Sequence, residues 1–99
     1  MPVNRLNSAA LERTLRTVGM KTFVDFYKDF SDPQVTLTDI KLKLSSCGYS
    51  ANSISTKAST GRRIINNGQG REALELIIKA TRVDEDTRKK AEELLSKEL

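Results

Sequence analysis

The sequence of 99 residues contains no histidine, no tryptophan and a single cysteine, Cys47. A lone cysteine excludes a disulfide within the chain, and without histidine the usual zinc sites cannot be assembled. The common pairs of a nucleophile and a base are also missing, because histidine is the usual base. We therefore expect no metal, no cofactor, no small-molecule substrate and no enzymatic activity.

Long apolar runs are missing as well. None approaches the roughly 20 residues of a membrane-spanning helix, and the start of the chain lacks the apolar stretch of a secretory signal peptide. Apolar residues make up 37% and charged residues 30% of the chain, which is typical of globular proteins. We expect one domain over residues 1–99, with a single modest core, located in the cytoplasm.

Acidic residues are absent from Ile40 to Gly70. Five of the 17 basic residues lie in this segment, while the other 12 nearly balance the 13 acids, so the net charge of +4 originates here. These five are Lys41, Lys43, Lys57, Arg62 and Arg63. A positive charge concentrated in one segment favours a polyanion as the partner. By contrast, the basic residues at 88–90 lie among acids and indicate an ordinary exposed helix face.

Apolar residues recur at steps of three and four along most of the chain, which predicts an all-α fold of five or six short helices. A first helix is expected from Asn7 or Ser8 to Gly19, and a second from about Lys21 to Phe30. The second contains four of the five aromatic residues, and their helical spacing indicates the anchor of the core.

The stretch 35–44 is compatible with two kinds of secondary structure, a strand or a helix. Its alternation of apolar and polar residues would suit a strand, but a helical stripe explains more of its apolar positions: Leu37, Ile40, Leu44 and Cys47. Thr36 or Thr38 can cap such a helix and Gly48 can end it, so we interpret the stretch as a helix. Cys47 is then expected to be buried, and Leu42 lies off the buried face.

A longer helix is expected after Ser50, which is a suitable N-cap. Its apolar stripe contains small residues, and Gly61 at its middle would let a neighbouring helix lie close. The helix-breaking sequence at 66–70 ends this helix. It lacks the Lys-Ser/Thr ending of a phosphate-binding P-loop. Two more helices are expected, over about 71–80 and from Asp84 onwards.

The two central helices and their turn resemble the layout of a helix-turn-helix over about residues 37–66. In that layout asparagine and arginine read base edges, while serine, threonine and lysine hold phosphates. The candidate nucleic-acid-binding residues are Lys41, Lys43, Ser50, Asn52, Ser53, Thr56, Lys57, Thr60, Arg62, Arg63 and Arg71. Lys43 and Lys57 stand where a tight standard turn would bury apolar residues, so a longer turn or a different angle is expected.

The hypothesis is a protein that binds double-stranded DNA, such as a small transcriptional regulator or a nucleoid or accessory factor, alone, as a dimer or with a larger partner. The alternative is a non-enzymatic adaptor or homodimer that docks on an acidic protein, with Phe26, Leu42 and Leu76 left over for the contact. A polar helix face can also be plain solvated surface. RNA is less favoured, because Tyr49 is the only aromatic residue in the basic segment.

Overall fold

The computed structural model of the protein describes residues 7–98, and over that range the chain forms seven helices and no strand. They are α1 (Ser8–Val18), α2 (Met20–Asp25), α3 (Tyr27–Ser31), α4 (Leu37–Ser45), α5 (Ala51–Asn66), α6 (Gly70–Lys79) and α7 (Glu85–Glu98). The all-α prediction is confirmed, and the stretch that fitted two structures is helical from Leu37 onwards.

Local capping residues explain where the helices begin. The Asn7 side chain accepts a hydrogen bond from the Ala10 amide at 2.8 Å and caps α1. Thr36 caps α4 by accepting from the Asp39 amide at 3.2 Å, and the Asp39 carboxylate accepts from the Thr36 amide at the same distance. This reciprocal pair is a capping box, which satisfies two backbone donors at a helix start.

The expected count of five or six helices is wrong, because the helix predicted for 21–30 is broken into α2 and α3. At Phe26 the backbone leaves the helical region, with φ −110° and ψ 17°. The Phe26 amide still donates to the Thr22 carbonyl at 3.0 Å, so α3 continues α2 after a bend. The bend has a packing reason, since α2 packs against α7 whereas α3 packs against α5.

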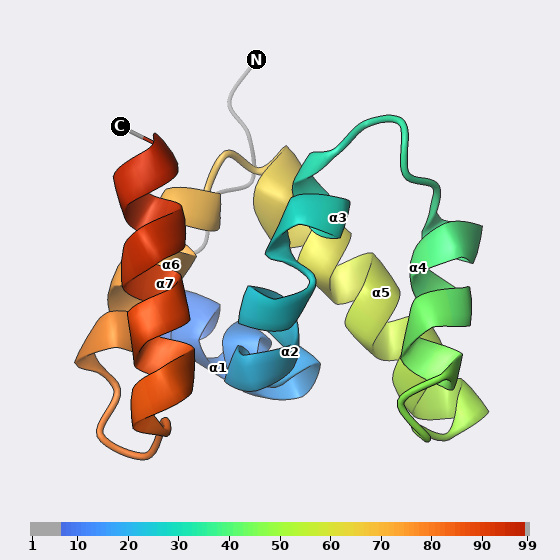
Figure 1. Cartoon of the computed structure of the whole chain (residues 1–99), viewed down its shortest axis with the longest axis horizontal. Coiled ribbons are helices and arrows are strands. Elements are labelled where there is room, and N and C mark those ends of the chain that lie inside the picture. Colours follow the sequence, from blue (N-terminus) through green and yellow to red (C-terminus); the bar gives the residue numbers. More distant parts are fainter. Residues whose placement is uncertain (1–6, 99) are drawn as a thin grey trace.

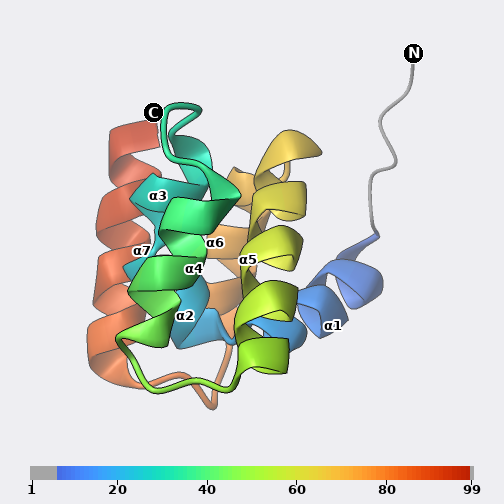
Figure 2. The ribbon, with the colours of Figure 1, turned by 90° about the vertical axis from the view of Figure 1, so that its right-hand side faces the viewer.

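The helices are arranged around the α2–α3 segment (Figure 1). The pair α6 and α7 covers one end of the molecule, while α4 lies at the opposite end against α5. Figure 2 shows that α5 runs back alongside α4 and that α1 lies on the other side of α5. The α4–α5 pair therefore forms an exposed edge of the fold.

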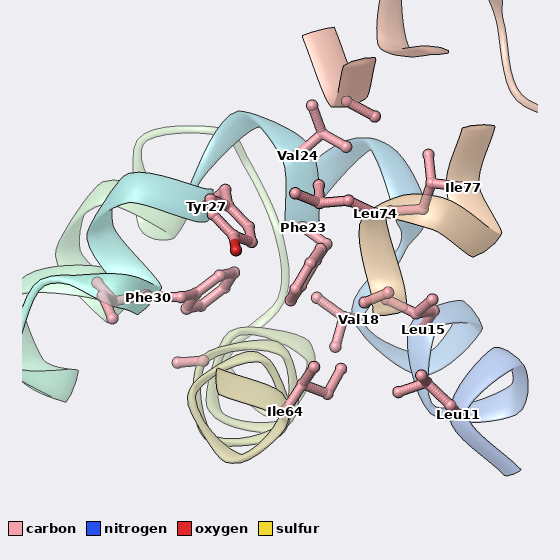
Figure 3. Packing of buried hydrophobic residues seen from close by; sticks show 14 of the residues in the cluster. Leu11, Leu15, Val18, Phe23, Val24, Tyr27, Phe30, Ile64, Leu74 and Ile77 are labelled. Atoms are coloured by element: carbon pink, nitrogen blue, oxygen red, sulfur yellow. The ribbon is translucent and has the colours of Figure 1, made fainter. Parts of the chain in front are cut away.

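The core is centred on the aromatic residues of α2 and α3 (Figure 3). The ring centroids of Phe23 and Phe30 are 5.8 Å apart in a stacked arrangement, and Tyr27 meets Phe23 edge-on at 5.5 Å. Leu15 from α1 and Ile64 from α5 are fully or almost fully buried beside them. The prediction that this aromatic stripe anchors the core is confirmed.

Gly61 lies where α5 packs closely against the aromatic core. A Cβ atom added at this position would lie 2.5 Å from Cζ of Phe30. Since real Cβ contacts are longer than this, only glycine allows the two helices to meet at this distance. The prediction of a close helix contact at Gly61 is confirmed.

Membrane-spanning character is lacking in residues 7–98: none of the described helices combines the length and the apolar composition that crossing a bilayer requires.

Candidate nucleic-acid interface

The two helices predicted to form the interface, α4 and α5, are present and adjacent. Their connection runs from Ser46, which ends α4, to Ser50, which caps α5 by accepting from the Ser53 amide at 3.3 Å. Gly48 provides the turn, with a φ of +87° that side chains rarely adopt. These five residues exceed the three to four of a standard helix-turn-helix turn. We call α4, the connection and α5 the central hairpin.

Cys47 lies in this connection and is exposed, so the expectation that it is buried is wrong. The helical stripe of α4 ends at Ser45, two residues too early to carry Cys47 into the core. The buried residues of α4 are Ile40 and Leu44. Leu42 is off the buried face as expected, and 64% of its surface is exposed.

One face of α5 consists of exposed polar side chains at steps of three and four residues. They are Asn52, Ser55, Thr56, Ser59, Arg63 and Asn66, and we call them the outer stripe of α5. No acidic residue occurs in α5 or in the connection before it. A helix face of mostly short polar side chains with one arginine and no acid allows a polyanion to come close without electrostatic repulsion.

Lys57 does not belong to this stripe, although it was expected to face outwards. Its Nζ donates to the backbone carbonyl of Val18 at 2.6 Å, at the C-terminal end of α1. The same ammonium group lies 4.9 Å from the centroid of the Tyr49 ring, and the Tyr49 hydroxyl is 2.9 Å from the Thr22 hydroxyl. A cation at a helix C-terminus satisfies a free carbonyl and the helix dipole. Lys57 therefore attaches α5 to α1.

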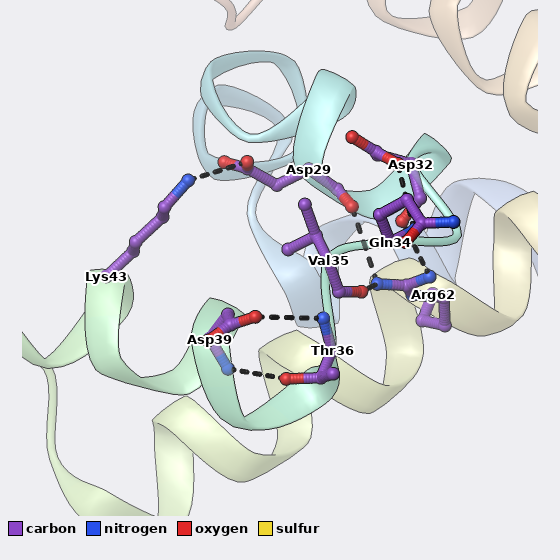
Figure 4. Close-up of polar contacts among 8 residues, drawn as sticks. All are labelled: Asp29, Asp32, Gln34, Val35, Thr36, Asp39, Lys43 and Arg62. Carbon is purple, nitrogen blue, oxygen red and sulfur yellow. Dashed lines mark hydrogen bonds and ion pairs between the residues drawn. The ribbon is translucent and has the colours of Figure 1, made fainter.

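Arg62 also points inwards, towards the segment that joins α3 to α4 (Figure 4). Its Nη1 donates to the Asp32 carbonyl at 3.2 Å, and its Nη2 donates to the Asp29 carbonyl at 3.4 Å and to the Val35 carbonyl. One guanidinium thus serves three backbone acceptors where the chain leaves α3. Arg62 fixes α5 to the 32–35 segment, and its Nε, which has no hydrogen-bond partner, is buried and therefore closed to an external phosphate.

Two further candidates have acidic partners on the surface. Lys43 forms an ion pair with Asp29 at 2.7 Å, which Figure 4 shows reaching across to α3. Arg71 faces Glu75 one turn along α6 at 3.9 Å. Exposed ion pairs of this kind contribute about 0 to 1 kcal/mol, so both cations can exchange their partner for a phosphate.

The remaining candidates divide by exposure. Lys41 is half-buried and Arg63 is exposed, and neither forms an ion pair within residues 7–98. Ser50 is engaged as the cap of α5, and Ser53 is half-buried. Thr60, expected on the outer face, is instead buried, because it lies on the inward face together with Ile64. Asn52 and Thr56 are exposed as expected.

Sequence inspection overlooked Arg13. This residue is exposed on α1, which packs against α5 and lies beside it in Figure 2. Arg13 lies outside the acid-free segment, so no local pattern links it to the central hairpin. Only the packing of α1 against α5 connects the helix that carries this cation with the central hairpin.

Acidic and thiol side chains form no cluster here that resembles a metal site. Within the described range, no group of three or more His, Cys, Asp or Glu side chains lies close enough to hold a metal ion. The expectation that the protein is not an enzyme stays a prediction.

Comparisons with known proteins give no match: no protein-family model fits the chain, and neither a curated protein nor a solved structure is similar to it. Its function must therefore be inferred from its own residues.

Proposed function

We propose that this protein binds double-stranded DNA through the outer face of the central hairpin. The observation that supports this most is the outer stripe of α5, which is exposed, polar and free of acidic residues over its whole length. Short side chains let a helix approach a groove closely, and an asparagine such as Asn52 can bond both exposed atoms of an adenine edge.

Phosphate contacts come from the cations that have no internal role. Arg63 and Lys41 are the first candidates, and Lys43 can join them by leaving Asp29. Lys57 and Arg62 act instead as positioning residues, because they hold α5 against α1 and against the 32–35 segment. The proposed interface is therefore a rigid helix face with few charges.

The small number of free cations sets the expected salt dependence. Each phosphate contact on duplex DNA contributes about −0.9 to the slope of log affinity against log salt. With two or three such contacts the slope should be about −2 to −3, well below the slope of about −4.5 that all five basic residues of the segment would give. Binding at physiological salt is then weak for a single chain, and a dimer or a larger partner would strengthen it.

A regulator or a nucleoid or accessory factor would use such a face. We propose the cytoplasm as its location, as for a factor that acts on a nucleoid.

The test is fluorescence anisotropy of a labelled random-sequence duplex at several salt concentrations. The double variant Lys41→Gln/Arg63→Gln should bind at least tenfold more weakly at low salt, and its slope should be smaller in magnitude by about 2. The matched control, Lys89→Gln/Lys97→Gln, removes the same charge from exposed positions of α7 and should bind almost normally. Equal losses in both variants would indicate attraction by net charge alone and would contradict the proposed interface.

The adaptor or homodimer remains the second candidate, supported by the exposure of Leu42. Phe26 and Leu76 are half-buried and pack against the core, so Leu42 is the leftover apolar residue that is largely exposed. A contact made by Leu42 should resist salt and be lost in Leu42→Gln. DNA binding should weaken as salt rises and should survive Leu42→Gln. Light scattering at several salt concentrations distinguishes the two.

A further inference from the structure

A cavity of about 710 Å³ lies between α1, the start of α2 and the connection from α6 to α7. Apolar side chains contribute to its wall, among them Met20 and Val83, which also pack against the core. This volume is within the range of small-ligand pockets. In Figure 1 the 80–84 connection lies at the end of the molecule opposite α4, so the cavity is separate from the central hairpin.

The 80–84 connection forms one wall of the cavity, and hydrogen bonds with residues of α7 hold it in place. Arg88 in α7 donates from Nη2 to the carbonyls of Ala80 at 2.9 Å and Val83 at 3.1 Å. Asp84 accepts a side-chain hydrogen bond from Thr87, which lowers the pKa of Asp84, and the nearby Lys21 lowers it further. A ligand would therefore find a preformed wall and would not have to order a loop.

The charges around the cavity leave a positive surplus. The lining has three basic residues against two acidic ones, Glu12 and Asp84. Glu12 is already paired with Arg16 at 2.8 Å. Lys21 and Arg82 line the same cavity, are exposed and have no ion pair in the described part of the chain. An anionic group entering the cavity meets Arg82, which has no acidic partner in the described part of the chain, and Lys21, whose attraction to Asp84 acts without a direct ion pair.

We propose that this cavity binds a small organic anion with an apolar body. The apolar body packs against Met20 and Val83, and a carboxylate or phosphate head group is held by Lys21 and Arg82. A guanidinium and an ammonium group bind either head group through charge-assisted hydrogen bonds. This site does not depend on the DNA-binding proposal, because it shares no residue with the central hairpin.

The test is a nuclear magnetic resonance titration of the isotope-labelled full chain with 1-naphthoate, with 1-naphthyl phosphate and with the neutral 1-naphthalenemethanol. Binding of either anion should shift the amides of residues 20–21 and 80–84. The two anions distinguish a carboxylate site from a phosphate site. The neutral compound should bind roughly tenfold more weakly, since it lacks the contacts to both cations.

Two variants of equal charge locate the site. Lys21→Gln/Arg82→Gln should weaken binding of the anion roughly tenfold, while Lys89→Gln/Lys97→Gln should change it less than about twofold. The dispersed spectrum of each variant shows that it is folded. The proposal is overturned if neither anion shifts these amides, if the neutral compound binds as well as the anions, or if both variants weaken binding equally.

Discussion

At the scale of single residues, the basic side chains of the central hairpin have two kinds of role. Lys57 and Arg62 donate to backbone carbonyls of other segments, whereas Arg63, next in the chain to Arg62, is exposed. The last carbonyls of a helix have no partner within the helix, and a long cationic side chain can reach them. Two arginines that are neighbours in the chain therefore differ in role: Arg62 stabilises the fold, and Arg63 is exposed on the surface.

Replacing Arg62 by glutamine should destabilise the protein by about 2 kcal/mol, because hydrogen bonds from a charged group to partly buried carbonyls are lost. The matched control is Arg63→Gln, which changes an exposed side chain and should alter the free energy of unfolding by less than about 0.5 kcal/mol. Urea unfolding measures both. Equal effects would contradict the assignment of Arg62 as a positioning residue.

Asp84 gives the stability a dependence on pH. Its hydrogen bond with Thr87, assisted by Lys21, lowers its pKa in the folded protein below the ordinary value of 3.8. A lowered pKa adds stability above the ordinary value, and this contribution is lost as the pH falls through the folded-state pKa. Unfolding midpoints measured from pH 6 down to pH 2 should therefore fall less in Asp84→Asn than in the natural protein. An identical decline in both would show that Asp84 contributes nothing.

At the scale of elements, local signals predict where most helices begin, whereas contacts between distant segments determine where a helix is broken. Asn7, Thr36 and Ser50 cap the helices that the sequence indicates, because a cap acts within three residues. The bend at Phe26 was not predictable, since the aromatic spacing continues through it and only the packing of α2 and α3 on different helices requires it. Helix positions follow from local sequence, but breaks depend on tertiary packing.

Gly61→Ala tests the crossing of α5 and α3. Alanine gains about 1 kcal/mol of helix propensity, but the added Cβ overlaps the buried ring of Phe30, and overpacking costs about 1 to 3 kcal/mol. We expect a net loss of about 1 kcal/mol in thermal or urea unfolding. The control is Ser55→Ala, an exposed position on the same helix, which should be neutral or slightly stabilising. A stabilised Gly61→Ala would show that the ring can move aside.

At the scale of the whole molecule, the sequence indicates which segment is positive but not which charges are free. The carbonyl that Lys57 reaches is 39 residues away in the chain, and those that Arg62 reaches are 27 to 33 residues away. No local pattern reveals such partners. Arg13 is the opposite case, because its helix, α1, packs against α5 although Arg13 lies outside the acid-free segment.

One continuous core should make unfolding cooperative. Buried residues from α1 to α7 belong to the same cluster, from Leu11 to Ala91. A single core of this size usually unfolds in one step. Far-ultraviolet circular dichroism and the fluorescence of Tyr27 and Tyr49 should therefore give coincident urea transitions. Separate midpoints would show that the central hairpin melts independently and would contradict a single domain.

The exposed thiol of Cys47 has a practical consequence for any study of association. It is the only cysteine in the chain, so air oxidation can join it only to another molecule. Two chains linked in this way would present paired hairpins and mimic a natural dimer on a sizing column. Oligomer measurements thus require a reductant or Cys47→Ser. The same thiol accepts a maleimide dye, which would report directly from the tip of the hairpin.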